Sequence, residues 1–440
     1  MQSEIEILFR SGHTEERKYI IDVLFSVFLG IPYRLVVDGQ VADYHIRFEG
    51  GELVIRDKFW KNDLKEPLAY LTESAFPKIS FLRDCPFSPE KDIPVLYGED
   101  EFIISEGKVI CGIDIFASSF FMLTRWEEYV NKTRDSHGRF PGEASVAFRN
   151  RFLHRPVVNE YVEMLWNMLK ASGYMGERKK QGFQLVLTHD VDVMKSINPV
   201  RIIAGDILKR RDFKRALLHI PALFKDPVDT YSFLMDQSEK IGVKSHFYFM
   251  AVENRDNDFD TPYYLNTKKF RRLVRKIRER GHVIGFHPGY TTCRNEERWG
   301  MEKNRLEQVM DEKLTEGRQH YLMMEVPYTL RIWEKWGMKM DSTLGYADRE
   351  GFRCGTGNCF PVFDFLERRV LDLYESPLVV MDGTLRTYRN QSCDQAMDII
   401  SSYITCGKKY NMPVTFLFHN SSFDRRMWRG WKRMYKKLLA

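Results

Sequence analysis

The stretch FQLVLTHDVD, residues 183–192, decides the fold of the longer part of this chain. It opens with a short, largely apolar run (183–188) that has the length of a buried strand. The run passes directly into His189, Asp190 and, two positions on, Asp192. Where parallel strands alternate with helices, working side chains stand at the carboxyl ends of strands, because the following loops gather there. The stretch therefore predicts a parallel-strand domain with a site at the end of this strand.

Similar apolar runs recur along the rest of the chain. Helical patterns such as TKKFRRLVRKIRERG and PYTLRIWEKWG separate them, and the runs are HFYFM (246–250), HVIGF (282–286), HYLMM (320–324), PLVVM (377–381) and PVTFLF (413–418). Alternating strands and helices indicate parallel βα units, in a barrel or a doubly wound sheet.

The first part of the chain has a different texture. Residues 33–57 alternate apolar and polar positions around Asp-Gly and Gly-Gly, which predicts consecutive hairpin strands. Helices are expected over 114–130 and from 157 to Gly173, with a polar loop, RDSHGRF, between them. Because 440 residues exceed one ordinary core, we predict a smaller α+β domain at 1–178, with ERKKQG as the linker, and an α/β domain at 179–440.

Composition narrows the choice of partners and compartment. The net charge is only +6, which does not favour a nucleic-acid partner. A basic stretch interleaved with Trp and Tyr at 425–437 is typical of a helix that packs on its own domain; peripheral membrane contact through this tail is the alternative. The seven cysteines form no close CxxC pair and the N-terminus shows no secretion signal, so we predict free thiols in the cytoplasm.

Four ionisable side chains are expected to converge at one rim of the second domain. His287 follows the run HVIGF and His419 follows PVTFLF, as Asp190 and Asp192 follow the first run. Asp190 and Asp192 share one side of an extended segment because side chains alternate. Aspartate and histidine bind divalent metals and move protons near neutral pH.

The order of these motifs resembles that of the polysaccharide deacetylases, carbohydrate esterase family 4. THDVD (188–192) resembles the family's TFDD, GHVIGFHPGYT (281–291) its His-Ser/Thr-x-x-His, and LFH (417–419) its Leu-x-His. The resemblance covers roughly residues 183–424. It is closest to a branch of the family in which a separate N-terminal domain carries RWEEY (125–129) and HGRF (137–140).

This resemblance implies a distorted (β/α) barrel and a metal-dependent hydrolase that removes N-acetyl groups from a glycan or glycan precursor. Asp190 would be the general base, acting on a metal-activated water, and His419 the general acid. Asp192 and His287 would bind one divalent metal, with zinc as the first choice.

Further positions are candidates for supporting roles. Thr291 stands where the family's second motif has its second histidine, and Pro288 fills the Ser/Thr position. Met323 or Met324 stands where the third motif would bring an arginine, so Arg353 is a candidate substitute from another loop. Asp382, after the run PLVVM, resembles a position that tunes the catalytic groups; a turn role is the alternative. The Gly-rich segment 341–357 is expected to shape the substrate cleft.

Two other functions stay open because of these departures. One is a carbohydrate-binding protein without activity on the same fold, and the other is a hydrolase of a different non-peptide C–N bond. The remaining histidines are predicted to be structural: His189 faces away from the aspartates, and His246, His282 and His320 precede their runs, which places them on the opposite rim.

Overall fold

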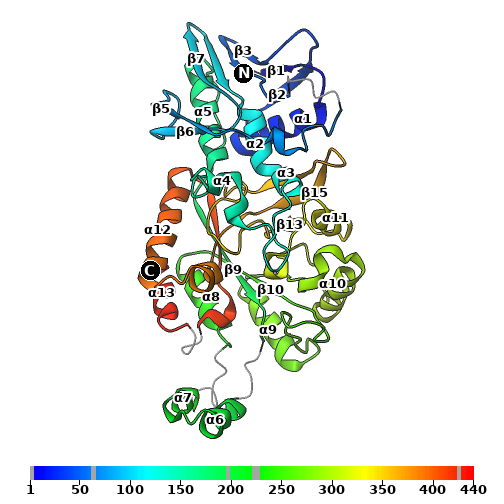
Figure 1. The fold of residues 1–440 in the computed structure, drawn as a ribbon, viewed down its shortest axis with the longest axis vertical. Coiled ribbons are helices and arrows are strands. Elements are labelled where there is room, and N and C mark those ends of the chain that lie inside the picture. The colour runs from blue at the N-terminus through cyan, green and yellow to red at the C-terminus, as the bar shows by residue number, and fades with distance from the viewer. Residues whose placement is uncertain (1–3, 61–65, 195–198, 221–227, 424–427) are drawn as a thin grey trace.

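The computed structural model describes residues 4–60, 66–194, 199–220, 228–423 and 428–440. Two sheet-bearing parts are stacked along the long axis, with the N-terminal part at one end (Figure 1). The chain passes between them as an extended segment after residue 174 and enters the second sheet at Gln184.

A six-stranded mixed sheet forms the centre of the N-terminal part. Its order is β2 (Tyr33–Val37), β1 (Ile5–Phe9), β3 (Tyr44–Phe48), β4 (Gly51–Ile55), β8 (Lys108–Ile113) and β7 (Gly98–Ser105). A separate ribbon pairs β5 (Ser80–Arg83) with β6 (Asp92–Val95). β3 and β4 form a hairpin as predicted, but β2 lies parallel to β1, which separates it from β3. The prediction of consecutive hairpins over 33–57 is wrong for β2, because the sequence pattern shows alternation but not the partner strand.

Helices cover this sheet and extend toward the second part. They are α1 (Thr14–Asp22), which continues as the π-helical segment η1 (Val23–Leu29), α2 (Ile115–Thr124), α3 (Trp126–Val130), α4 (Val146–Arg149) and α5 (Val157–Ala171). The single helix expected over 114–130 is divided at Arg125, which has a φ of 54°. Short 3-10 turns lie at η2 (Glu73–Ala75) and η3 (Gly142–Ala144).

The second part is built on a nine-stranded sheet that curls into a half-barrel. Its order is β14 (Phe360–Asp364), β15 (Arg369–Glu375), β13 (Met340–Asp341), β12 (Glu316–Gly317), β11 (Val283–Phe286), β10 (Ser245–Phe249), β9 (Gln184–Val191), β17 (Pro413–Leu417) and β16 (Leu378–Met381). All neighbours are parallel except β14 and β15. The α/β fold class and the barrel-like architecture are confirmed.

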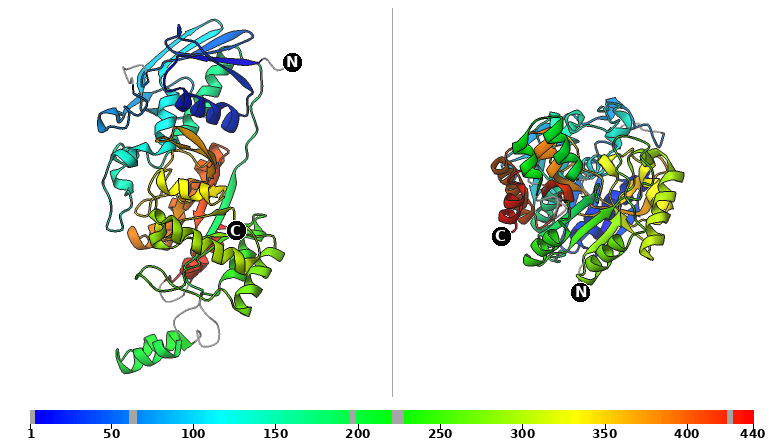
Figure 2. Two further views of the ribbon diagram at one scale, coloured as in Figure 1. Left: turned by 90° about the vertical axis from the view of Figure 1, so that its right-hand side faces the viewer. Right: turned by 90° about the horizontal axis from the view of Figure 1, so that it is seen from below.

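Helices surround the curled sheet when the molecule is seen along its axis (Figure 2). They are α8 (Tyr231–Lys240), α9 (Lys268–Glu279), α10 (Glu296–Met310), α11 (Tyr328–Lys335), α12 (Cys393–Lys409) and α13 (Trp431–Leu438). Two more, α6 (Pro199–Leu208) and α7 (Phe213–His219), project from the end of the barrel (Figure 1). Short segments after the strands are η5 (Tyr290–Arg294), η6 (His320–Leu322), η7 (Thr384–Tyr388) and η8 (Asn420–Phe423).

The two parts share one hydrophobic core. Tyr19 of α1 stacks on Phe363 of β14, with ring centroids 4.8 Å apart, and its hydroxyl donates to the Pro361 carbonyl at 2.9 Å. A buried ion pair, Arg353 with Glu128, also crosses the junction, with both side chains 3% exposed. The N-terminal part is therefore packed firmly against the strand edge of the half-barrel.

The C-terminal helix lies on the barrel through its apolar face. Trp431, Met434 and Tyr435 of α13 are buried, and the Tyr435 ring packs on Phe418 with centroids 4.8 Å apart. Arg425 and Arg426 of the basic tail lie outside the described residues. Among the described helices, none combines the length and apolar character needed to cross a membrane.

Candidate active site

Strand β9 brings the first two candidate residues to the end of the sheet. Asp190 is almost fully buried, and Asp192 follows the strand on the same side. His189 faces the other way, as predicted: its ring nitrogens lie 2.8 Å from the Phe418 carbonyl oxygen and 3.2 Å from Ser245 Oγ.

Three side chains point their ligand atoms at one another. An oxygen of Asp192 and one ring nitrogen each of His287 and His320 lie within 4.8 Å of one another. Asp192 Oδ1 is 3.2 Å from His287 Nε2 and 3.8 Å from His320 Nε2. Carboxylate and imidazole ligands in this number are typical of a divalent transition metal with open positions left for water or substrate.

The second nitrogen of each imidazole is already bound, which fixes its orientation. His287 Nδ1 donates to the Arg318 carbonyl at 2.6 Å, and His320 Nδ1 donates to Asp260 Oδ1 at 2.8 Å. Such outer partners orient metal-binding histidines and keep Nε2 as the lone-pair atom. Within the described part of the chain, Asp192 Oδ1 and His287 Nε2 are buried without a hydrogen-bond partner. Buried polar atoms of this kind call for a partner, and a cation between them fits the donor set.

His320 was predicted to be structural, and this prediction is wrong. The run HYLMM is a 3-10 turn rather than a strand; the strand is β12, only Glu316–Gly317. His320 therefore follows its strand and reaches the site. Thr291, predicted at the position of the missing second histidine, is an exposed residue of η5 and is not among the residues that line the cavity around these groups.

A buried arginine holds Asp190. Arg318 Nη1 donates to Asp190 Oδ1 at 2.9 Å and to Thr188 Oγ1 at 2.8 Å, and Nε donates to the Ser342 carbonyl at 2.7 Å. Arg318, which directly follows β12, thus takes the place for which Met323, Met324 and Arg353 were considered. Arg353 pairs with Glu128 at the junction between the two parts and does not reach Asp190.

His419 and Asp382 form a second hydrogen-bonded pair at the site. His419 Nδ1 lies 2.7 Å from Asp382 Oδ1, and its backbone N–H donates to Asp382 Oδ2 at 2.8 Å. Nε2 faces the site, 3.6 Å from Asp192 Oδ2. Burial lowers the pKa of His419, but the carboxylates of Asp382 and Asp192 outweigh burial and raise this pKa to about 10. The two carboxylates thus favour the charged form of the His419 imidazole.

Asp192 is held in its charged form by the same neighbours. Burial raises the pKa of its carboxyl, but the nearby His419, His320 and His287 hold it well below its usual range. An ionised carboxylate is the form that binds a metal.

These groups open into a cavity of about 260 Å³. Part of its wall is apolar, formed by Leu322, Met381 and Leu417, which pack as one small cluster. The rest is polar or aromatic and includes Arg139, Tyr321, Tyr388, Ser421 and Trp428. The segment 341–357, expected to shape the cleft, contributes none of the lining residues. Arg139, from the N-terminal part, is a lining residue that sequence reasoning missed.

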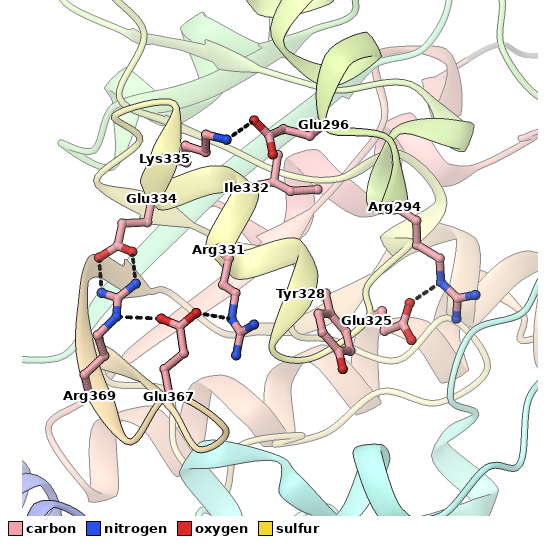
Figure 3. Close-up of a pocket in the computed structure, with 10 residues that line it drawn as sticks. All are labelled: Arg294, Glu296, Glu325, Tyr328, Arg331, Ile332, Glu334, Lys335, Glu367 and Arg369. Atoms are coloured by element: carbon pink, nitrogen blue, oxygen red, sulfur yellow. Dashed lines mark hydrogen bonds and ion pairs between the residues drawn. The ribbon is translucent and has the colours of Figure 1, made fainter.

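A larger hollow of about 780 Å³ lies beside α11 (Figure 3). Its charges are compensated within the hollow: Arg369 pairs with Glu334 at 2.7 Å, and Lys335 pairs with Glu296 at 2.7 Å. It contains no histidine, cysteine or aspartate among its lining residues. Although this hollow is larger than the cavity at Asp190 and His419, it is the weaker candidate for an active site.

The other two histidines, His246 in β10 and His282 just before β11, make structural contacts as predicted. His246 Nδ1 lies 2.6 Å from Glu316 Oε1. His282 Nδ1 accepts from the Ser245 backbone N–H at 2.9 Å, and its Nε2 lies 3.1 Å from Glu239 Oε1. Both rings therefore hold strands and helices together away from the cavity.

Comparisons with known proteins cover the two parts separately. A family of unknown function (DUF7033) matches residues 7–174. No curated protein sequence matches the chain.

Solved structures similar to the chain are polysaccharide deacetylases and their relatives. A protein named as a polysaccharide deacetylase from Mycobacterium smegmatis is 14% identical, with a TM-score of 0.39, over 60% of this chain and 85% of that one. A family 4 carbohydrate esterase from Streptomyces lividans, in complex with acetate, is 13% identical, with a TM-score of 0.30, over 59% and 89%. A pseudoenzyme of the same family from Bacillus anthracis is 11% identical, with a TM-score of 0.30, over 59% and 61%.

Proposed function

We propose that this chain is a metal-dependent hydrolase that removes N-acetyl groups from a glycan or a glycan precursor. The observation that carries the proposal is the convergence of Asp192, His287 and His320 next to a further carboxylate and a further imidazole. Asp190, held by Arg318, lies 3.7 Å from His287 Nε2. His419, held by Asp382, lies 3.6 Å from Asp192 Oδ2.

Amide hydrolysis requires a base, an acid and a means of polarising the carbonyl group. A divalent cation held by Asp192, His287 and His320 would polarise the acyl carbonyl and lower the pKa of water. Asp190 would accept the proton of the attacking water, and Arg318 would keep its carboxylate in position. His419, protonated at neutral pH, would donate a proton to the leaving amine nitrogen.

The substrate class rests on the motif resemblance and on the character of the cavity. Leu322, Met381 and Leu417 offer an apolar wall suited to an acyl methyl group in the cavity that Asp190 and His419 also line. Polar and aromatic groups, such as Tyr388 and Trp428, suit the hydroxyls and the faces of a sugar. We propose zinc as the metal because two imidazoles and one carboxylate with open positions suit it.

The two alternative functions differ in support. The binding-protein alternative rested on a missing second histidine and a missing arginine; the positions of His320 beside Asp192 and of Arg318 beside Asp190 support the hydrolase instead. A carbohydrate-binding protein without activity and a hydrolase of another C–N bond are both outcomes that the experiments below distinguish. We also propose a cytoplasmic setting, because all seven cysteines are free thiols and free thiols are typical of a reducing compartment.

Metal analysis of the purified protein tests the proposal first. We expect about one zinc per chain, lost in His287→Ala and retained in His45→Ala, which removes a histidine of β3 that pairs with Glu52. Acetate release from chito-oligosaccharides, beside a panel of small amides, then separates the two reactions. A wild-type protein that takes up no divalent metal would refute the proposal.

A further inference from the structure

A loop of the N-terminal part reaches the wall of the cavity. Within it, Asp135 Oδ1 accepts from the backbone N–H groups of His137 and Arg139, both at 2.9 Å. Asp135 Oδ2 accepts from Arg139 Nε at 2.8 Å, and the Asp135 N–H donates to the Arg139 carbonyl at 2.9 Å. The loop is thus braced internally, and the buried Arg139 guanidinium is aimed in a fixed direction.

Arg139 links two barrel segments that flank the site. Its Nη1 donates to the Tyr321 carbonyl at 2.8 Å, and its Nη2 donates to the Tyr388 hydroxyl at 2.9 Å. Tyr321 directly follows His320 in η6, and Tyr388 ends η7, the segment that follows Asp382. The Arg139 guanidinium therefore joins η6, which begins with His320, to η7, which follows Asp382.

The η6 turn needs such support because its backbone is unusual. Tyr321 and Leu322 have φ values of 57° and 54°. Residues with a side chain rarely adopt this left-handed region, and they do so where surrounding contacts over-determine the conformation. The hydrogen bond from Arg139 acts on the carbonyl group inside this turn, one residue from His320.

The same loop also covers the outer partner of His320. His137 Nδ1 lies 3.1 Å from the Tyr290 hydroxyl, and the His137 ring is 5.1 Å from that of Phe259. Phe259 precedes Asp260, which accepts from His320 Nδ1, and the Tyr290 N–H donates to Asp260 Oδ1 at 2.9 Å. The loop thus contacts both segments that fix the direction of His320.

We propose that the N-terminal domain completes the active site, with Arg139 as a positioning residue that holds His320 in its metal-binding direction. The inference rests on the proposed function and extends it by giving a role to the part of the chain that matches a family of unknown function. Without this loop, the η6 turn with its two left-handed residues would lose the hydrogen bond that Arg139 donates to the Tyr321 carbonyl.

Zinc affinity of the full-length protein tests this role, measured by competition with a chromophoric chelator beside thermal unfolding. We expect Arg139→Ala to weaken zinc binding about 10-fold, the lower end of the range for outer partners of metal-binding histidines, because Arg139 acts through the residue next to His320. Arg139→Lys should restore only part of the wild-type zinc affinity, because the lysine ammonium group lacks the planar guanidinium fork that reaches both acceptors. Arg349→Ala is the matched control: it removes another ion pair between the same two parts, with Glu143, and should leave zinc affinity unchanged.

Tyr388→Phe supplies a second variant in case Arg139→Ala fails to fold. It removes one acceptor without a cavity and should weaken zinc binding a few-fold, with no added effect in the Arg139→Ala background. Wild-type zinc affinity in Arg139→Ala and in Tyr388→Phe would overturn the inference and leave the proposed function standing. A wild-type protein without zinc affinity would instead remove the proposed function itself.

A second inference concerns the hairpin of α6 and α7, which stands apart from the barrel (Figures 1 and 2). It is inserted in the chain directly after β9, the strand that carries Asp190. Large apolar side chains on it are open to solvent: Leu208 is 78% exposed, and Phe213 and Leu217 are each 64% exposed. Exposed apolar groups gathered on one projection mark an interaction surface.

The positive charge of the hairpin indicates which kind of surface it would bind. Lys209, Arg210, Arg211 and Lys214 are exposed beside these apolar side chains. Over residues 199–220 the sequence has six lysines and arginines against two aspartates. Basic residues around an apolar face are complementary to an anionic lipid surface. We infer that the hairpin docks the barrel end onto an anionic membrane surface.

Co-sedimentation of the full chain with vesicles tests this docking. We expect binding to phosphatidylcholine vesicles that contain phosphatidylglycerol, weaker binding to pure phosphatidylcholine, and at least about tenfold less binding for Leu208→Ser/Phe213→Ser/Leu217→Ser. Ile104→Ser, at an exposed apolar residue of β7, is the control. Absence of vesicle binding by the wild type would overturn the inference. Self-association of the wild type that the triple variant abolishes would also overturn it, because the exposed apolar side chains would then bind a second copy of the chain.

Discussion

Replacing Asp382 by asparagine should lower the pKa of His419 by about 1–2 units. The Asp382 carboxylate lies 2.7 Å from His419 Nδ1 and is among the groups that raise this pKa to about 10. A hydrogen bond to a charged partner contributes about 1.5–3 kcal/mol, and one pKa unit corresponds to about 1.4 kcal/mol. Asparagine keeps the size of the side chain but removes the charge. The protonated form of His419 should then be lost at lower pH.

The assay is an NMR titration of the histidine ring carbons in zinc-free protein. His154, whose pKa is lowered by burial away from the site, should titrate identically in both proteins, and Asp394→Asn controls for the loss of one negative charge at the surface. In the zinc-loaded enzyme, the alkaline limb of kcat should move to lower pH, because a general acid works only while protonated. An unchanged His419 titration in Asp382→Asn would refute the reasoning.

Three further variants test other parts of the structure. Asp190→Asn should lower amide hydrolysis by about 10²–10⁴-fold while zinc content stays the same; loss of zinc would place Asp190 among the ligands instead. Arg353→Ala should lower the free energy of unfolding by about 3 kcal/mol, measured with urea, because it leaves Glu128 buried without one of its partners; a change below about 1 kcal/mol, as for exposed pairs, would contradict this. Gly317→Ala should destabilise the protein and reduce its zinc content, because a Cβ there would lie 1.9 Å from the Phe286 carbonyl oxygen; normal thermal unfolding with full zinc would show that the strands can shift.

The convergence of Asp190, His419 and Asp382 could be predicted because apolar runs in the sequence mark the strands that carry them. β9 and β17 are buried, are five residues or longer, and are hydrogen-bonded neighbours in the sheet. Asp190 lies near the carboxyl end of β9, and His419 follows β17 after one residue, so both could be placed at one rim from sequence alone. Asp382 follows the adjacent β16 and could be placed there for the same reason.

His320 and Arg318 escaped prediction because their strand has no apolar run. β12 has two residues, and one of them is Gly317. The neighbouring run HYLMM has the composition of a strand but forms a turn, since Tyr321 and Leu322 take left-handed conformations. Local composition cannot show this, because contacts from distant residues such as Arg139 stabilise the turn.

The glycine of β12 was nevertheless a usable signal. Gly317 lets the backbone approach Phe286 closely, and the Arg318 N–H donates to the Phe286 carbonyl at 3.0 Å. This contact places the Arg318 carbonyl where His287 Nδ1 donates to it, at 2.6 Å, while the Arg318 side chain turns to Asp190. A single residue after a two-residue strand thus orients both a proposed metal ligand and the proposed base. A side chain at Gly317 would push β12 away from Phe286 and would therefore disturb both contacts at once.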